Sequence, residues 1–348
     1  MGLPNIAITF TQIASTAIER SERGIVLLLL TDSTKTGNAT YTSPAEVTTE
    51  DWNASNVGYI KEAFLGGAAK VVCVRKAENT LTDGTLNAYD FNWMASPVSG
   101  DQTGIVTYVK ARNAESAGKK IKAVVFNQTA DDIHLINFTN SKVTRKDQAQ
   151  ADGVTYCPRI AGILAGLPFT RSATFYELDD IESVVEPADV DAAIDGGQFV
   201  IINDFGEPKV GRAVNSKTTL STTENESIKH ITVVEAMDLM QEDIYSTFKK
   251  TYVGKYKNKY ANQCLFLSAI NQYFDALTRD DILDPEYDNH AEIDVEAQRQ
   301  AWIEAGTDAS GWDEITVKKN TFRTNLYLTG NVKILDAIED MKFVISLA

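Results

Sequence analysis

The residues that most often carry metal or nucleophilic chemistry are few and widely separated in this chain. They are His134, His230, His290, Cys73, Cys157 and Cys264. No two cysteines have a CxxC or zinc-type spacing, and the sequence contains no GxSxG nucleophile motif. Because a structural zinc needs closely grouped ligands and a hydrolase needs a base beside its nucleophile, we predict neither a metal site nor catalytic residues. The isolated cysteines are expected to be buried thiols in a reducing compartment.

A nucleotide cofactor would require a glycine-rich loop directly after a buried strand. The apolar run Ile25–Leu30 is the strand candidate, but the following segment, Thr31–Gly37, contains neither G-x-G-x-x-G nor G-x-x-x-x-G-K-[ST]. The glycine pairs at 66–67 and 196–197 follow expected helices, where glycines are typical helix stops. We therefore predict no cofactor.

Three acids have the spacing of the first ligands of a calcium loop. Asp284, Glu286 and Asp288 stand at positions 1, 3 and 5 of such a loop. However, Asn289 replaces the glycine of the sharp turn, and Val295 replaces the bidentate glutamate. The pattern therefore favours a solvated acidic loop over a metal site.

The charge of the chain is strongly uneven. Its 33 Lys and Arg and 48 Asp and Glu give a net charge of −15, which disfavours nucleic acid and anionic lipid as partners. Thirteen acids lie between Asp275 and Glu314, opposed only by Arg279 and Arg299. Just before them lies a lysine cluster with no intervening acid, consisting of Lys249, Lys250, Lys255, Lys257 and Lys259. This cluster is either a solvated helix end or a contact patch for an acidic partner surface.

Membrane insertion is not expected. The longest apolar run, Ile25–Leu30, is far shorter than the roughly 20 residues that a spanning helix needs. The start of the chain also lacks the basic and apolar regions of a signal peptide.

Alternating strands and helices between residues 24 and 205 predict a doubly wound α/β domain. Buried strands are expected at 24–30, 71–74, 91–95, 123–126, 133–138 and 199–202, and helices near 59–65, 105–117, 154–167 and 188–195. From Ser227 the apolar spacing becomes helical, with two long amphipathic helices and a third helix near 293–305.

Both ends of the chain alternate like strands. Near the start, Ile6, Ile8 and Phe10 share one side of an expected strand. Near the end, apolar residues alternate at 326–334 and again at 341–347, which predicts an antiparallel hairpin whose last strand is the chain end. A terminal strand can pair within its own fold or be lent to the sheet edge of a neighbour, and the pattern leaves both open.

Several segments, in this order, resemble contractile tail sheath proteins of phages and phage-derived particles of Gram-positive bacteria. They are GLPNIAITF…AIERSERGIVLLLL at the start, RIAGILAGLPFTRSATFYEL (159–178), GRAVNSKTTL (211–220), YVGKYKNKYANQCLFLSAINQYFDAL (252–277), DVEAQRQAWIEAG and VKILDAIEDMKFVISL. The short length is most similar to sheaths of R-type bacteriocins and clostridial-type phages. Larger relatives carry a β-sandwich insertion where this chain has only the loop 76–90, so the resemblance implies a minimal sheath subunit.

The resemblance implies three parts. These are an N-terminal arm (1–20), an α/β sheath core domain without the insertion (21–226), and a C-terminal α+β sheath domain that ends in a strand-like arm (227–348). The implied function is structural and not enzymatic: a helical homo-oligomer around an inner tail tube, contracting to drive that tube through a cell envelope. Implied partners are other copies, the tube protein, and baseplate and tail terminator proteins. The particle would be a phage tail or phage-tail-like contractile injection system, assembled in the host bacterial cytoplasm.

The resemblance also assigns roles to particular residues. The arms exchanged between subunits would be Ile6, Ile8 and Phe10 at one end and Phe343, Ile345 and Leu347 at the other. The recipient hairpin would contain Leu326, Leu328, Val332 and Ile334. The lysine cluster would contact the tube or a neighbouring sheath subunit, and the acidic stretch a basic surface on the next subunit. The alternative is an α/β enzyme or small-molecule-binding protein with an acidic helical domain, which would show a pocket of carboxylates with shifted pKa values.

Overall fold

The computed structural model describes residues 17–82 and 84–346, which belong to two compact units. The core unit contains residues 20–242 together with the terminal segment that starts at Ile334. The C-terminal unit contains residues 243–333 and, of the described residues near the start of the chain, 17–19. The division lies inside one helix, α5 (Ile231–Thr247), which contributes to both units.

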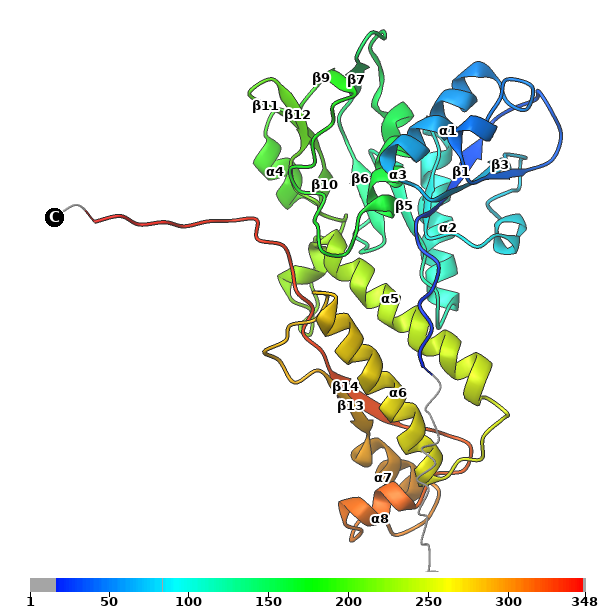
Figure 1. The fold of residues 1–348 in the computed structure, drawn as a ribbon, viewed down its shortest axis with the longest axis vertical. Coiled ribbons are helices and arrows are strands. Elements are labelled where there is room, and N and C mark those ends of the chain that lie inside the picture. Colours follow the sequence, from blue (N-terminus) through cyan, green and yellow to red (C-terminus); the bar gives the residue numbers. More distant parts are fainter. Residues whose placement is uncertain (1–16, 83, 347–348) are drawn as a thin grey trace, which may run out of the picture. The chain divides into compact units, whose positions relative to one another are not determined.

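The core unit is built on a mainly parallel sheet (Figure 1). Within the described residues this sheet has seven strands in the order β10-β6-β5-β4-β1-β3-β2, and only the edge strand β2 runs antiparallel to its neighbour. The strands are β1 (Ile25–Leu30), β2 (Ala39–Tyr41), β3 (Lys70–Arg75), β4 (Trp93–Ala95), β5 (Lys122–Phe126), β6 (Leu135–Phe138) and β10 (Gln198–Phe199). A parallel sheet interleaved with helices confirms the expected α/β class.

The fully apolar strand β1 lies inside the sheet, between β4 and β3, and both of its faces are covered. Val26, Leu28 and Leu30 belong to a core shared with α1 (Ala54–Gly66) and α3 (Cys157–Gly166). The residues between them, such as Leu27, belong to a second core shared with α2 (Gln102–Glu115). All six β1 side chains are buried, as the unbroken apolar run predicts.

Helices α1 and α3 approach closely through glycines. A Cβ on Gly162 would lie 2.1 Å from the carbonyl oxygen of Ala63, and one on Gly66 would lie 2.5 Å from the backbone of Gly162. Gly67 then ends α1 with a φ of 115° and donates its N–H to the carbonyls of Ala63 and Phe64. The expected helix stop is therefore confirmed at this glycine pair.

Smaller elements complete the core unit. They are the sheet β8-β7-β9, formed by β7 (Lys142–Arg145), β8 (Ala151–Asp152) and β9 (Ile181–Val184), the hairpin of β11 (Ile201–Asp204) and β12 (Glu207–Val210), and helix α4 (Val190–Asp195). The single strand expected at 199–202 is divided between β10, in the main sheet, and β11, in this hairpin.

Cys73 and Cys157 are buried as expected, whereas Cys264 is half-exposed, which corrects the expectation of three buried thiols.

The C-terminal unit is mainly helical and contains one small sheet. Its elements after the end of α5 are α6 (Tyr260–Arg279), α7 (Val295–Glu304), α8 (Glu314–Lys319), β13 (His290–Ile293) and β14 (Leu328–Asn331). Helix α6 buries the predicted apolar face, which includes Ile270, Phe274 and Leu277. Asp294 and Asp313 accept hydrogen bonds from the first turns of α7 and α8, so two acids of the acidic stretch are helix caps.

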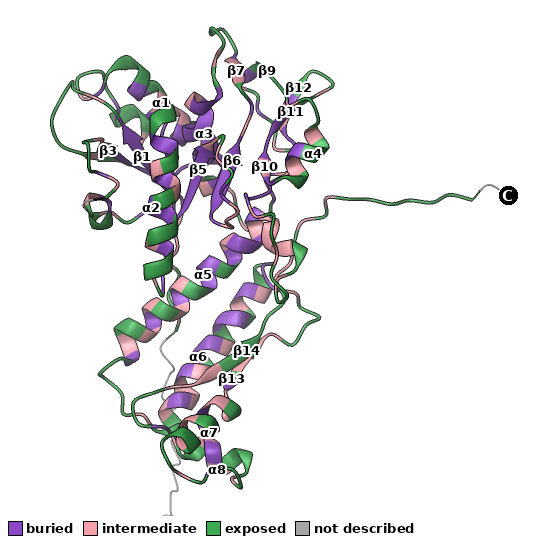
Figure 2. Ribbon diagram, turned by 180° about the vertical axis from the view of Figure 1, so that it is seen from behind, coloured by how far each residue is buried: buried purple, intermediate pink, exposed green. Residues whose placement is uncertain are grey.

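The terminal hairpin expected from the alternating pattern does not form within the chain. Strand β14 pairs antiparallel with β13, and residues 335–346 contain no strand. Strand β13 is only four residues long and lies in the acidic stretch, so its sequence carries no strong strand pattern. Apolar and polar residues do alternate along 341–346, but this segment forms no strand and pairs with no strand among the described residues (Figure 2).

Candidate assembly surfaces

The end of the C-terminal segment exposes apolar side chains. Met341, Phe343 and Ile345, which share one side of the expected strand, are 88%, 75% and 68% exposed. An extended, apolar chain without a sheet partner is a template for pairing with another chain. The other predicted arm residues, Leu347, Ile6, Ile8 and Phe10, lie outside the described residues.

The two-stranded sheet β13-β14 has one closed and one open edge. The side chain of Asn271 accepts a hydrogen bond from the N–H of Ala291 (2.7 Å) and donates one to its carbonyl (3.1 Å). These two bonds occupy the backbone of β13 on the side away from β14. In the described part of the chain, no strand pairs with the outer edge of β14, whose residues are half-exposed to exposed.

The predicted recipient residues lie in different places around this edge. Only Leu328 is inside β14, while Val332 follows the strand and is exposed. Leu326 precedes it and lines a cleft with Tyr252 and Phe266. Ile334 begins the terminal segment of the core unit and does not belong to the small sheet.

All five side chains of the lysine cluster are exposed, and none forms an ion pair with another described residue. Lys255 and Lys257 line the same cleft as Leu326. Aromatic side chains also line that cleft, with ring centroids 4.6 Å apart for Tyr252 and Phe266 and 5.0 Å apart for Tyr252 and Tyr256. The structure therefore brings two lysines of the cluster and one predicted recipient residue to the same cleft of the C-terminal unit.

Most acids of the Asp275–Glu314 stretch are exposed. Asp284, the first residue of the calcium-like spacing, forms an ion pair with Lys333 at 2.7 Å and accepts a hydrogen bond from the N–H of Glu286. Across residues 17–82 and 84–346, no group of three or more His, Cys, Asp or Glu side chains is arranged to hold a metal ion.

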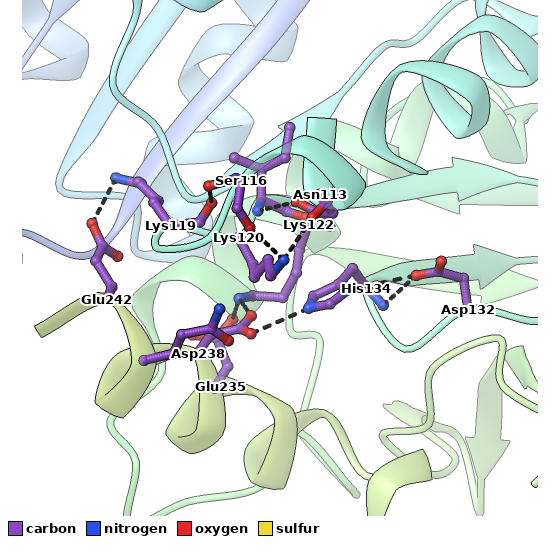
Figure 3. A network of polar contacts seen from close by, with 12 residues as sticks. Asn113, Ser116, Lys119, Lys120, Lys122, Asp132, His134, Glu235, Asp238 and Glu242 are labelled. Carbon is purple, nitrogen blue, oxygen red and sulfur yellow. Dashed lines mark hydrogen bonds and ion pairs between the residues drawn. The ribbon is translucent and has the colours of Figure 1, made fainter. Parts of the chain in front are cut away.

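A buried ionic network lies in the core unit, where the sequence pattern gave no signal for it (Figure 3). Lys122 of β5 is 1% exposed and pairs with Asp238 and, at 3.0 Å, with Glu235, both on α5. The imidazole of His134 lies between two carboxylates, 3.2 Å from Asp238 and 3.6 Å from Asp132. The network ties the start of α5 to the sheet.

The charges of this network support one another. Burial lowers the pKa of Lys122, but the carboxylates of Asp238 and Glu235 outweigh it and raise that pKa above its usual value. Burial likewise opposes the charged form of His134, while hydrogen bonds to Asp132 and Asp238 raise its pKa overall. Burial raises the pKa of Asp238, but Lys122 and His134 hold it well below its usual range. Removing one partner of such a network would leave an uncompensated buried charge, which is strongly destabilising.

Sequence comparison identifies relatives over the whole length. A family profile described as "Phage tail sheath C-terminal domain" matches residues 223–348. The tail sheath protein of Clostridium phage phiCD119 is 31% identical over 368 aligned residues, covering 99% of this chain and 99% of the relative.

Solved structures show the same fold at lower identity. The sheath tail protein from Desulfitobacterium hafniense has a TM-score of 0.68 and 16% identity, covering 83% of this chain and 94% of that one. The helical sheath of the anti-feeding prophage in the contracted state has a TM-score of 0.70 and 12% identity, covering 99% of both chains. No helix among the described residues has the length and apolar character to span a membrane. The full-length match to a tail sheath protein shows that this chain belongs to the phage tail sheath family.

Proposed function

We propose that this contractile tail sheath protein polymerises as a helix around an inner tube and shortens to drive that tube through a cell envelope. Its partners would be other copies of itself, the tube protein, and baseplate and tail terminator proteins. Support comes from the full-length relationship to a phage tail sheath protein and from the fold shared with a contracted helical sheath. The particle would be a phage tail or a phage-tail-like injection system, assembled in the host bacterial cytoplasm.

The observation that carries this proposal is the apolar, unpaired end of the chain. Phe343 and Ile345 are largely exposed in a segment that alternates like a strand. Covering such side chains is favourable because burial removes apolar surface from water, at about 25 cal/mol per Å². A neighbouring copy that accepts this segment as an added strand would also satisfy its backbone groups. Leu347, Ile6, Ile8 and Phe10 would complete the two exchanged arms.

We propose the outer edge of β14 as the acceptor of an exchanged strand. Asn271 already occupies the backbone of Ala291 on the outer edge of β13, whereas the outer edge of β14 is open. Leu328 would lie within the new strand pair, with Leu326 and Val332 at its two ends. Because main-chain hydrogen bonds are insensitive to side-chain identity, such a pair could persist while other contacts between subunits slide.

The lysine cluster would supply a charged contact to an acidic surface, either of the tube or of a neighbouring sheath subunit. Its exposure and its lack of acidic partners among the described residues support this role. The acidic stretch would face basic surface on the next subunit. No step of this function requires catalysis, and the comparisons give no support to the enzyme alternative.

Deleting the exchanged arms tests the proposal. Removal of residues 1–12, or of residues 341–348, should leave a soluble, folded monomer that no longer forms tubes, as judged by circular dichroism and electron microscopy. A matched control, Lys342→Ser, changes a polar residue of the same segment and should still permit tube formation. Normal tubes from either truncated protein would contradict arm exchange.

A further inference from the structure

The first half of the C-terminal segment is held by three side chains of the core unit. Asp336 pairs with the Nδ1 atom of His230. Glu339 accepts a hydrogen bond from the hydroxyl of Ser172 at 2.9 Å and lies 3.5 Å from the guanidinium of Arg212. The same guanidinium pairs with Asp340 at 2.6 Å.

These contacts end abruptly along the chain. The side chain of Glu339 is 9% exposed, whereas Ile338 before it and Met341 after it are 98% and 88% exposed. The change at Asp340 is therefore one of polar contacts and not of burial. From Met341 to Ser346 no side chain forms an ion pair or hydrogen bond with another described residue. The segment is therefore divided into a held half and a free half at Asp340.

The three holding side chains come from separate parts of the core unit. Ser172 follows α3, Arg212 follows β12, and His230 directly precedes α5. A hydrogen bond from the imidazole to the Asp336 carboxylate raises the pKa of His230, which favours its charged form. Similarly, Asp340 raises the pKa of Arg212. Charge-assisted hydrogen bonds of this kind are stronger than neutral ones, and they restrict the geometry in which the two side chains meet.

We propose that Ser172, Arg212 and His230 form a polar latch that fixes the C-terminal arm up to Asp340, so that only residues from Met341 onward are free to enter another copy. This proposal rests on the proposed arm exchange. The latch sets where the exchanged strand leaves its own subunit and which residue begins it. If the latch opened, residues 335–340 would also become free and would add about 20 Å of reach at roughly 3.3 Å per residue.

Two proteases can measure the latch on the monomer, without any need for tubes. Glu-C cleaves after Glu339, inside the held half, and trypsin cleaves after Lys342, inside the free half. In the wild-type protein, the fragment that begins at Asp340 should appear much more slowly than the fragment that begins at Phe343. Both fragments are identified by mass spectrometry.

Arg212→Gln removes the central contact of the latch. Because cleavage follows the population of the open form, this variant should accelerate cleavage after Glu339 on the order of tenfold. Cleavage after Lys342 should stay unchanged and serves as an internal control. Asp336→Asn, on the arm itself, should give a smaller acceleration, because Glu339 and Asp340 keep their contacts with Ser172 and Arg212. The matched control is Lys209→Gln, which removes ion pairs to Asp204 and Glu207 that do not touch the arm.

Equal cleavage rates after Glu339 in the wild-type and Arg212→Gln proteins would overturn the latch. That result would leave arm exchange intact, because arm exchange is judged separately from tube formation by the truncated proteins. Conversely, a latch confirmed by proteolysis together with normal tubes from the truncated proteins would contradict arm exchange alone.

Discussion

Lys122 illustrates how a single charged residue is accommodated in a buried strand. It lies beneath the start of α5, with Asp238 and Glu235 as partners, and its amino group lies 5.7 Å from the ring of Trp93. An unpaired buried ammonium would be strongly unfavourable, so the burial of Lys122 depends on these two carboxylates of α5.

His134 makes the same network sensitive to pH. Because its pKa is raised in the folded state, the protonated imidazole contributes stability that is fully present below about pH 6.5 and is lost as pH rises through the folded-state pKa. His134→Gln should therefore lower the free energy of unfolding by about 1–2 kcal/mol at pH 6 and by less at pH 8.5. Urea unfolding at the two pH values measures this difference. Parallel pH profiles for the wild-type and variant proteins would show that His134 is not protonated in the fold.

At the scale of elements, close backbone approach depends on glycine at several sites, of which two join neighbouring helices or strands directly. Gly162 lets α3 pack against α1, and Gly330 lets β14 lie against β13. At both positions a Cβ would lie 2.5 Å or less from a backbone atom of the facing element, a separation that real Cβ atoms do not adopt. The identity of these residues is therefore set by the partner element and not by the local conformation.

Gly330→Ala tests the role of the small sheet. Its Cβ would lie 2.5 Å from the carbonyl oxygen of His290, so the pairing of β13 and β14 must shift, at a cost of about 1–3 kcal/mol. We expect faster hydrogen exchange in both strands and impaired tube formation, with little change in the core unit. Gly311→Ala is the matched control in the same unit, because nothing lies within 4 Å of its added Cβ. Normal tubes together with faster exchange would contradict the role of β14 as acceptor.

At the scale of the whole molecule, the charges are separated along the chain. The lysine cluster and the acidic stretch are both in the C-terminal unit, and most of these side chains are exposed. Exposed charges of opposite sign in one unit are suited to contacts between copies or with the tube, and salt should weaken such contacts.

Charge reversal measures this contribution. Lys255→Glu with Lys257→Glu should reduce the rate of sheath assembly on tubes, by on the order of tenfold at low salt, and the difference should shrink as salt is raised. Light scattering during assembly gives the rate. The matched control is Lys61→Glu with Lys146→Glu, two exposed lysines of the core unit. Unchanged assembly in the Lys255 and Lys257 variant would indicate that the cluster is only a solvated surface.

The sequence alone was sufficient for the features that arise from local patterns. The apolar run of β1 predicted a strand covered on both faces, and the glycines at 66–67 predicted the end of α1. The ordered sheath-like segments indicated the family. Each of these depends on neighbouring residues, whose hydrophobic period or backbone freedom is visible in the sequence.

Only the tertiary structure decided which distant residues meet. The partner of β14 is β13, which is too short and too polar to stand out, and the expected hairpin was therefore wrong. The partners of Lys122 lie more than 100 residues away on α5, and those of Asp336 and Asp340 precede α5. Ion pairs and edge pairings have no period along the chain, because their geometry exists only once the elements have packed.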